Sequence, residues 1–80
     1  MQVNFKSTPD NYWKEKIGLK NNTVRKIDDD KRFELLRKFE FKQFALFIEI
    51  TNTDTNGSFI REITDVTKFE GLYLISWKAN

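Results

Sequence analysis

Aromatic side chains must provide most of the hydrophobic core of this chain, because disulfides and the common metal clusters are not available to it. The 80 residues include eight phenylalanines, two tryptophans and two tyrosines, but no cysteine and no histidine. A chain of this size buries only about 60–65% of its extended surface, so a few large side chains carry most of its stability. The composition therefore predicts one domain, residues 1–80, with a core rich in phenylalanine.

The absence of cysteine and histidine also excludes several kinds of catalytic and metal-binding site. Without histidine there is no Ser-His-Asp triad and no imidazole metal site, so any catalysis would depend on Lys, Thr, Ser, Tyr or carboxylates. We expect no metal and no cofactor. Residues 1–6 alternate instead of forming the apolar run of a signal peptide, and the apolar stretch 44–48 is too short to span a bilayer. Together with the lack of cysteine, this predicts a cytoplasmic protein with no membrane partner.

The first twenty residues predict a strand followed by a helix. Residues 2–6 alternate apolar and polar side chains, which is typical of a half-buried strand. Pro9 suits the first helical position, and Gly18 suits the left-handed residue that ends a helix. Trp13 and Ile17 are four residues apart, so we expect them to face the core together, while Lys14, Glu15 and Lys16 stay in solvent.

The rest of the chain predicts one more helix and four more strands. In chain order we expect a strand at 23–27, a helix at 31–38 capped by one of Asp28–Asp30, a strand at 45–51, a hairpin turn at 52–57, a strand at 58–64, a loop at 67–71 and a strand at 72–78. Within the strand at 45–51 we expect Leu46, Ile48 and Ile50 to point the same way, and within the strand at 72–78 Tyr73, Ile75 and Trp77 alternate with their neighbours. Five strands in so short a chain bury their faces best by curling. The fold class is therefore α+β, a partly closed antiparallel β-barrel of about five strands with two flanking helices.

A local excess of positive charge marks the segment after the first helix. The net charge is only +2, with a pI near 9.0. Between residues 12 and 26, however, five basic residues stand against the single Glu15: Lys14, Lys16, Lys20, Arg25 and Lys26. This distribution predicts a basic patch on one part of the surface.

Residues 18–25 carry the chemistry expected of an anion site. Gly18 allows a close approach of the backbone, Lys20 can meet a phosphate, and Arg25 offers a planar fork for phosphate oxygens or a base edge. Thr23 shares a strand face with Arg25 and adds a hydroxyl. The candidate ligand-binding residues are Gly18, Lys20, Asn22, Thr23, Arg25 and Tyr12, the last as a ring that stacks on a base.

A purely structural interpretation of the same residues stays open. Gly18 would then serve only to end the helix, Lys20 would be a solvated loop residue, and Arg25 would pair with Glu49 or Glu62 across the sheet. We expect Trp77 to pack in the core, since it alternates with its neighbours. Asp28–Asp30 lack the pattern of a calcium loop, so we expect them to cap a helix and to aid solubility.

The spacing Gly18-x-Lys20-x-x-Thr23-x-Arg25, after a strand and a capped helix, resembles the signature of the ASCH (activating signal cointegrator homology) domains. These domains are PUA-like β-barrels, and the strands expected at 47–51, 59–64 and 72–77 suit such a barrel. The resemblance thus spans most of the chain and implies a short ASCH-like domain. In that family these positions line a cleft thought to bind RNA or nucleotides, so we expect an RNA, nucleotide or nucleoside partner.

Two alternatives to a binding module remain. One branch of the family hydrolyses acetylcytidine with a Lys, a Thr and a Glu, and the first two match Lys20 and Thr23. Glu62 is our choice for the carboxylate, although the sequence does not exclude Asp65 or Glu70. The other alternative is a phage-encoded inhibitor with a protein partner, suggested by the short length and the Lys and Asn content. We expect binding rather than catalysis.

Overall fold

The computed structural model describes residues 1–39 and 44–78, and these residues form two helices and five strands. In chain order the elements are β1 (Gln2–Ser7), α1 (Pro9–Lys16), β2 (Asn22–Lys26), α2 (Lys31–Phe39), β3 (Phe47–Asn52), β4 (Ser58–Phe69) and β5 (Leu72–Trp77). The predicted α+β class is confirmed, and each predicted helix and strand is present. Most of them end within two residues of the predicted position, whereas β4 ends five residues later.

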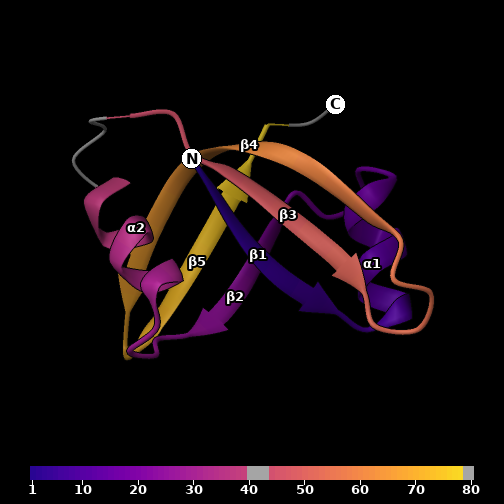
Figure 1. Cartoon of the computed structure of the whole chain (residues 1–80), viewed down its shortest axis with the longest axis horizontal. Coiled ribbons are helices and arrows are strands. Elements are labelled where there is room, and N and C mark those ends of the chain that lie inside the picture. The colour runs from indigo at the N-terminus through magenta and orange to yellow at the C-terminus, as the bar shows by residue number, and fades with distance from the viewer. Residues whose placement is uncertain (40–43, 79–80) are drawn as a thin grey trace.

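The five strands form one curled sheet in the order β1-β3-β4-β5-β2. β4 pairs first with β3 and then with β5, so that it arches across the molecule and joins the two halves of the sheet (Figure 1). Its register shifts between Ile63 and Asp65, where it changes partner, and such an irregularity increases the bend of a strand. The sheet is therefore a half-barrel with β1 and β2 as its edges, while α1 and α2 lie at opposite ends (Figure 1).

The prediction of an antiparallel sheet is wrong for one strand. β1 pairs in parallel with β3, from Gln2 opposite Phe47 to Ser7 opposite Asn52, whereas the other pairings are antiparallel. The alternation in residues 2–6 identifies a buried face, but it carries no information about strand direction. The sheet is mixed.

The loop predicted at residues 67–71 is also wrong. β4 continues to Phe69, and only Glu70 and Gly71 connect it to β5. Both residues have positive φ, 47° and 76°, which is the backbone pattern of a type I′ hairpin turn. Glutamate is uncommon in such turns, so the pair gave no recognisable hairpin signal. The hairpin predicted at 52–57 is confirmed, with Asn56 at a φ of 62°.

The core lies inside the curled sheet and beneath both helices. As predicted, Leu46, Ile48 and Ile50 point the same way, and each is 0% exposed. Trp77 is buried and meets Phe59 edge-on, with ring centroids 6.5 Å apart, which confirms its packing role. The other core residues are Val3, Phe5, Tyr12, Phe33, Leu36, Phe39, Ile63, Val66, Tyr73 and Ile75.

Helix α1 buries a different face from the one predicted. Trp13 and Ile17 are 51% and 65% exposed, whereas Tyr12 and Glu15 are buried. The spacing of Trp13 and Ile17 predicts a core face that leaves Glu15 in solvent. Glu15 has partners inside the protein, and this allows the helix to turn its Tyr12 side toward Phe59, 5.3 Å away between ring centroids.

Helix α2 begins as expected at the acidic triplet. Asp30 Oδ1 accepts a hydrogen bond of 2.9 Å from the backbone N–H of Arg32, which satisfies one free donor of the first turn. The capping role of the triplet is therefore confirmed. Phe33, Leu36 and Phe39 form the buried face of this helix.

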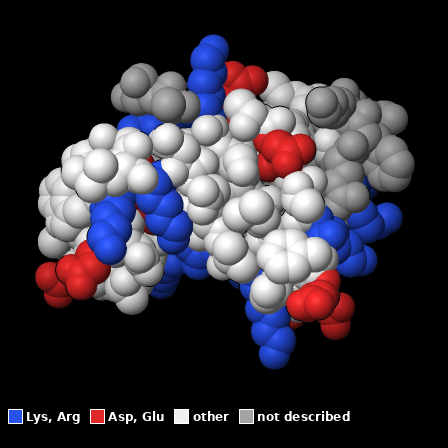
Figure 2. Space-filling model, turned by 180° about the vertical axis from the view of Figure 1, so that it is seen from behind, with Lys and Arg blue, Asp and Glu red and all other residues white. Residues whose placement is uncertain are grey.

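The outer face of β2 and β5 is only partly polar. Val24 is 49% exposed, and Leu72 and Leu74 beside it are half-buried. Figure 2 shows the molecule from this side, where much of the middle of the surface is uncharged and basic side chains lie mainly near its margin. Neither helix in the described residues is long and apolar enough to cross a membrane.

Candidate functional site

Three of the residues predicted to form a site meet at one pocket between the two edges of the half-barrel. This pocket has a volume of about 250 Å³, and we call it the Lys20 pocket. β1, α1 and β2 and the connections that follow the first two surround it. Its lining comprises Lys6, Ser7, Thr8, Asn11, Glu15, Lys20, Thr23, Val24 and Arg25. Lys20, Thr23 and Arg25 therefore lie together, as the strand-face argument predicts.

The Arg25 guanidinium closes the gap between the edge strands. Its Nε donates to Thr23 Oγ1 at 3.0 Å on its own strand, its Nη1 donates to the Lys6 carbonyl at 2.9 Å, and its Nη2 donates to Ser7 Oγ at 3.1 Å. The Ser7 carbonyl accepts a hydrogen bond from the backbone N–H of Thr53, the residue after β3. Because successive carbonyls of a strand point to opposite sides, the Lys6 carbonyl faces the open edge. Arg25 thus supplies a donor that a neighbouring strand would otherwise provide.

Glu15 is a buried carboxylate in the wall of the Lys20 pocket. It is 1% exposed, and its Oε1 accepts a hydrogen bond of 2.8 Å from the hydroxyl of Ser7. Its Oε2 lies 3.7 Å from Lys20 Nζ and has no hydrogen-bond donor among the described residues. Because Arg25 donates to Ser7, the single hydroxyl proton of Ser7 is directed to Oε1. One carboxylate oxygen in the pocket therefore remains open to a donor.

The charges around Arg25 oppose one another. Burial lowers the pKa of the Arg25 guanidinium, the Glu15 carboxylate raises it, and the nearby positive charge of Arg32 lowers it. Since arginine starts from a very high pKa, the guanidinium stays protonated at neutral pH. The pocket thus holds a fixed positive charge next to a carboxylate.

A second pocket lies on the other side of Arg25. It has a volume of about 320 Å³, and we call it the Arg32 pocket; it is lined by Asn4, Phe5, Lys6, Arg25, Arg32 and Thr51. The two guanidinium carbons lie over the same Phe5 ring, that of Arg25 4.9 Å and that of Arg32 4.5 Å from the ring centroid. Lys6 and Arg25 line both pockets. Together the two linings contain four basic residues and one acidic residue.

The remaining predicted site residues do not line either of these two pockets. Gly18 has a φ of 89°, and its carbonyl accepts a hydrogen bond from the side chain of Asn21, so it acts as the helix terminator. Asn22 begins β2 opposite Ser76. Tyr12 is 3% exposed and packs against Trp13 and Phe59, which leaves no open ring face for a base.

The carboxylates considered from the sequence are elsewhere as well. Glu62 is exposed on β4 opposite Phe47, and neither Asp65 nor Glu70 lines the Lys20 pocket. The pairing of Arg25 with Glu49 or Glu62 is wrong, since the hydrogen bonds of Arg25 go to β1 and to Thr23. The carboxylate in the pocket is Glu15.

Sequence reasoning missed Glu15, Ser7, Lys6 and Arg32. Ser7 and Lys6 end a strand whose parallel pairing was not recognised, and Glu15 was placed on the solvent side of α1. A signal for Glu15 did exist, because it follows Tyr12 by three residues and so shares its helix face. Nothing in the sequence indicates that Arg32 would reach back to β1.

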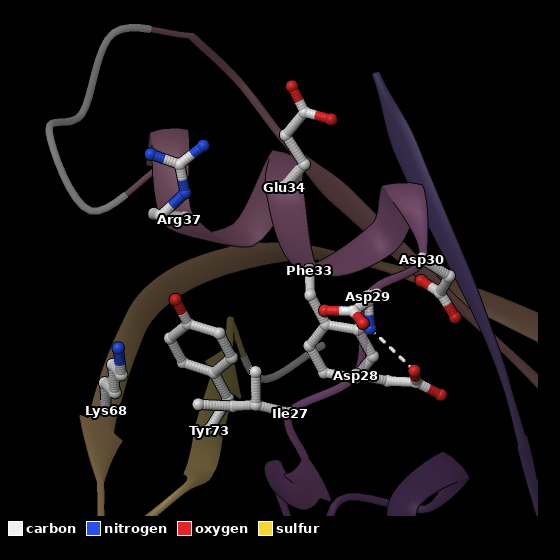
Figure 3. Close-up of a pocket in the computed structure, with 9 residues that line it drawn as sticks. All are labelled: Ile27, Asp28, Asp29, Asp30, Phe33, Glu34, Arg37, Lys68 and Tyr73. Carbon is white, nitrogen blue, oxygen red and sulfur yellow. Dashed lines mark hydrogen bonds between the residues drawn. The ribbon is translucent and has the colours of Figure 1, made fainter.

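Asp28–Asp30 line a separate pocket of about 250 Å³ beside α2 (Figure 3). The three aspartates stand toward one side, with Arg37 and Lys68 toward the other and the rings of Phe33 and Tyr73 between them (Figure 3). Asp28 Oδ1 accepts from the backbone N–H of Asp29. Among residues 1–39 and 44–78, no group of three His, Cys, Asp or Glu side chains is placed to hold a metal ion.

No protein-family model matches this sequence, and no curated protein matches it with significant similarity.

Proposed function

We propose that this protein is a nucleotide- or RNA-binding module and that the Lys20 pocket is its binding cleft. The observation that carries the proposal is the convergence of Lys20, Thr23 and Arg25 on one pocket. An ammonium and a guanidinium beside a hydroxyl suit a phosphate or the polar edge of a base. We also propose that the chain is an ASCH-like domain of the PUA-like superfamily, since the Gly18–Arg25 spacing resembles that family and the half-barrel has the coarse architecture such a domain requires.

The open oxygen of Glu15 supports a polar ligand. A buried carboxylate oxygen without a donor is unfavourable, so a bound N–H or O–H group that reaches it would be stabilised. Nucleobases and riboses carry such donors, while inorganic anions at neutral pH carry few. The pocket thus presents both donors and an acceptor. Its volume of about 250 Å³ lies below the range of roughly 300–1,000 Å³ typical of drug-sized ligands, which favours a single nucleoside unit.

Binding measurements on two variants test the proposal. Lys20→Ala removes an ammonium whose side chain is one-third exposed, and Arg25→Lys keeps a charge while removing the planar fork. We expect each variant to bind short single-stranded RNA and nucleotides about tenfold more weakly at low salt, as the loss of one charge-assisted hydrogen bond predicts. Fluorescence anisotropy for RNA and calorimetry for nucleotides would measure these affinities.

Lys26→Ala is the matched control. Lys26 follows Arg25 on the same strand but points to the opposite, exposed face, so the variant loses one positive charge outside the Lys20 pocket. We expect its affinity to change by about twofold or less, from the long-range charge alone. Equal weakening in the Lys20, Arg25 and Lys26 variants would indicate nonspecific attraction and would remove the pocket from consideration.

Amide hydrolysis of an acylated nucleoside is the second candidate function. The specific observation in its favour is that a lysine, a threonine and the Glu15 carboxylate line the same pocket. Binding is favoured over hydrolysis because Lys20 Nζ lies 3.7 Å from the Glu15 carboxylate, so the two groups that hydrolysis would use separately are paired with each other. Release of acetate from acetylcytidine, lost in Thr23→Val, would identify an enzyme. No turnover with ample protein would exclude this substrate.

A further inference from the structure

The Arg32 pocket holds two guanidinium groups around one aromatic ring, and this arrangement differs from an ordinary surface ion pair. The guanidinium carbons of Arg25 and Arg32 lie 4.9 Å and 4.5 Å from the centroid of Phe5. Two like charges held this close favour the entry of an anion.

The hydrogen bonds of both arginines leave donors for such an anion. Arg32 donates from Nε and Nη2 to Asp30 Oδ2 and from Nη1 to the Asn4 carbonyl, and Arg25 donates from each of its three nitrogens to β1 or β2. A guanidinium has five N–H groups, so each arginine uses three in these bonds and retains two. Asp30 balances one of the two charges, and the exposed Lys6 adds a third positive group to the lining.

We propose that the Arg32 pocket is a phosphate subsite, in which Arg25, Arg32 and Lys6 hold the phosphate of a nucleotide whose nucleoside part lies in the Lys20 pocket. The inference rests on the proposed function, because it assigns the second half of the same ligand. Lys6 and Arg25 line both pockets, so the two sites lie next to each other on either side of the Arg25 side chain. Planar guanidinium forks match phosphate oxygens in pairs.

Comparison of nucleosides with their monophosphates tests the subsite. Titrate the wild-type protein with the four ribonucleosides and the four ribonucleoside 5′-monophosphates at low salt. We expect the monophosphate of the best nucleoside to bind about tenfold tighter or more, as one or two charge-assisted contacts predict. Arg32→Gln should reduce this ratio to about twofold. Arg37→Gln, an exposed arginine on the same helix, should leave the ratio unchanged.

The possible failures are distinct. If nucleosides bind with Lys20 dependence but the phosphate adds nothing, the phosphate subsite is wrong and the proposed function survives. If neither nucleosides, monophosphates nor RNA bind, the proposed function is wrong as well. A ratio unchanged in Arg32→Gln also overturns the subsite.

A measurement on the unaltered protein covers the case in which Arg32→Gln does not fold. Add inorganic phosphate and follow the arginine Nε–H resonances by NMR. We expect those of Arg25 and Arg32 to shift in a saturable way, while that of Arg61 stays fixed, since its guanidinium contacts Ile60, Lys16 and Phe59 outside this pocket. Uniform shifts of all arginines, or no shifts, would contradict the subsite.

Discussion

Removal of the Arg25 side chain tests whether it is the structural link between the two edges of the half-barrel. Arg25→Ala deletes three hydrogen bonds, to Thr23, to the Lys6 carbonyl and to Ser7, together with the contact to the Phe5 ring. Each hydrogen bond contributes about 0.5–1.5 kcal/mol to the free energy of unfolding, and the ring contact contributes about 0.5–1 kcal/mol. The net loss of stability is smaller than this sum, because the variant no longer has to desolvate a charge.

We therefore expect Arg25→Ala to lower the free energy of unfolding by about 2–4 kcal/mol. For a domain of this size the corresponding decrease in Tm is roughly 10–25 °C. Urea unfolding followed by tryptophan fluorescence suits the measurement, since Trp77 is buried in the core and reports on its opening. Lys26→Ala, one residue further along β2 and exposed, should cost at most about 0.5 kcal/mol.

Two outcomes would refute this reasoning. A loss in Arg25→Ala no greater than that in Lys26→Ala would mean that Arg25 does not hold the edges together. A full recovery in Arg25→Lys would mean that charge alone matters, because lysine cannot reproduce three bonds in the geometry of a planar fork.

Glu15→Ala should destabilise the fold by about 1–3 kcal/mol in the same urea assay, because Ser7 loses its acceptor and Lys20 loses its counter-charge. Glu34→Ala, which removes one partner of an exposed ion pair, should cost less than about 0.5 kcal/mol. Gly71→Ala should lower stability by about 1–2 kcal/mol, since φ is +76° there and no neighbouring atom obstructs a Cβ. Gly71→Asn should cost less than half as much, because asparagine tolerates positive φ better than alanine. Equal costs would contradict a purely backbone effect. The hydrogen bond from Arg32 lowers the pKa of Asp30, so its contribution is present above about pH 4 and is lost as the pH falls through the lowered value. Asp30→Asn should accordingly be less stable than wild type at pH 7, with a difference that shrinks in acid; a difference that is constant with pH would contradict this assignment.

Much of the local structure could be predicted because it depends on neighbouring residues. Alternation in 45–51 and 72–78 identified the buried faces of β3 and β5, and Asp30 was within the triplet expected to cap α2. The left-handed Gly18 after α1 was predicted for the same reason, since a helix end is a local event. The shared strand face of Thr23 and Arg25 likewise follows from their spacing of two.

Two of the misses involve contacts between distant segments, and a third depends on a local turn. The face of α1 was misplaced because the burial of Glu15 depends on Ser7, which comes from β1. The direction of β1 relative to β3 depends on where the chain brings β3, and nothing within residues 2–6 specifies that direction. The length of β4 depends on a turn with an unusual residue, Glu70, at positive φ.

By itself, the sequence determined where the two helices and five strands lie, which faces of β3 and β5 are apolar, and that Lys20, Thr23 and Arg25 lie close together along the chain. Only the tertiary structure decided that these residues meet Glu15 and Ser7, and that Arg25 and Arg32 both reach the free edge of β1. The physical reason is that backbone preferences act over a few residues, whereas the burial of a charge is decided by the partners that folding brings to it from elsewhere in the chain.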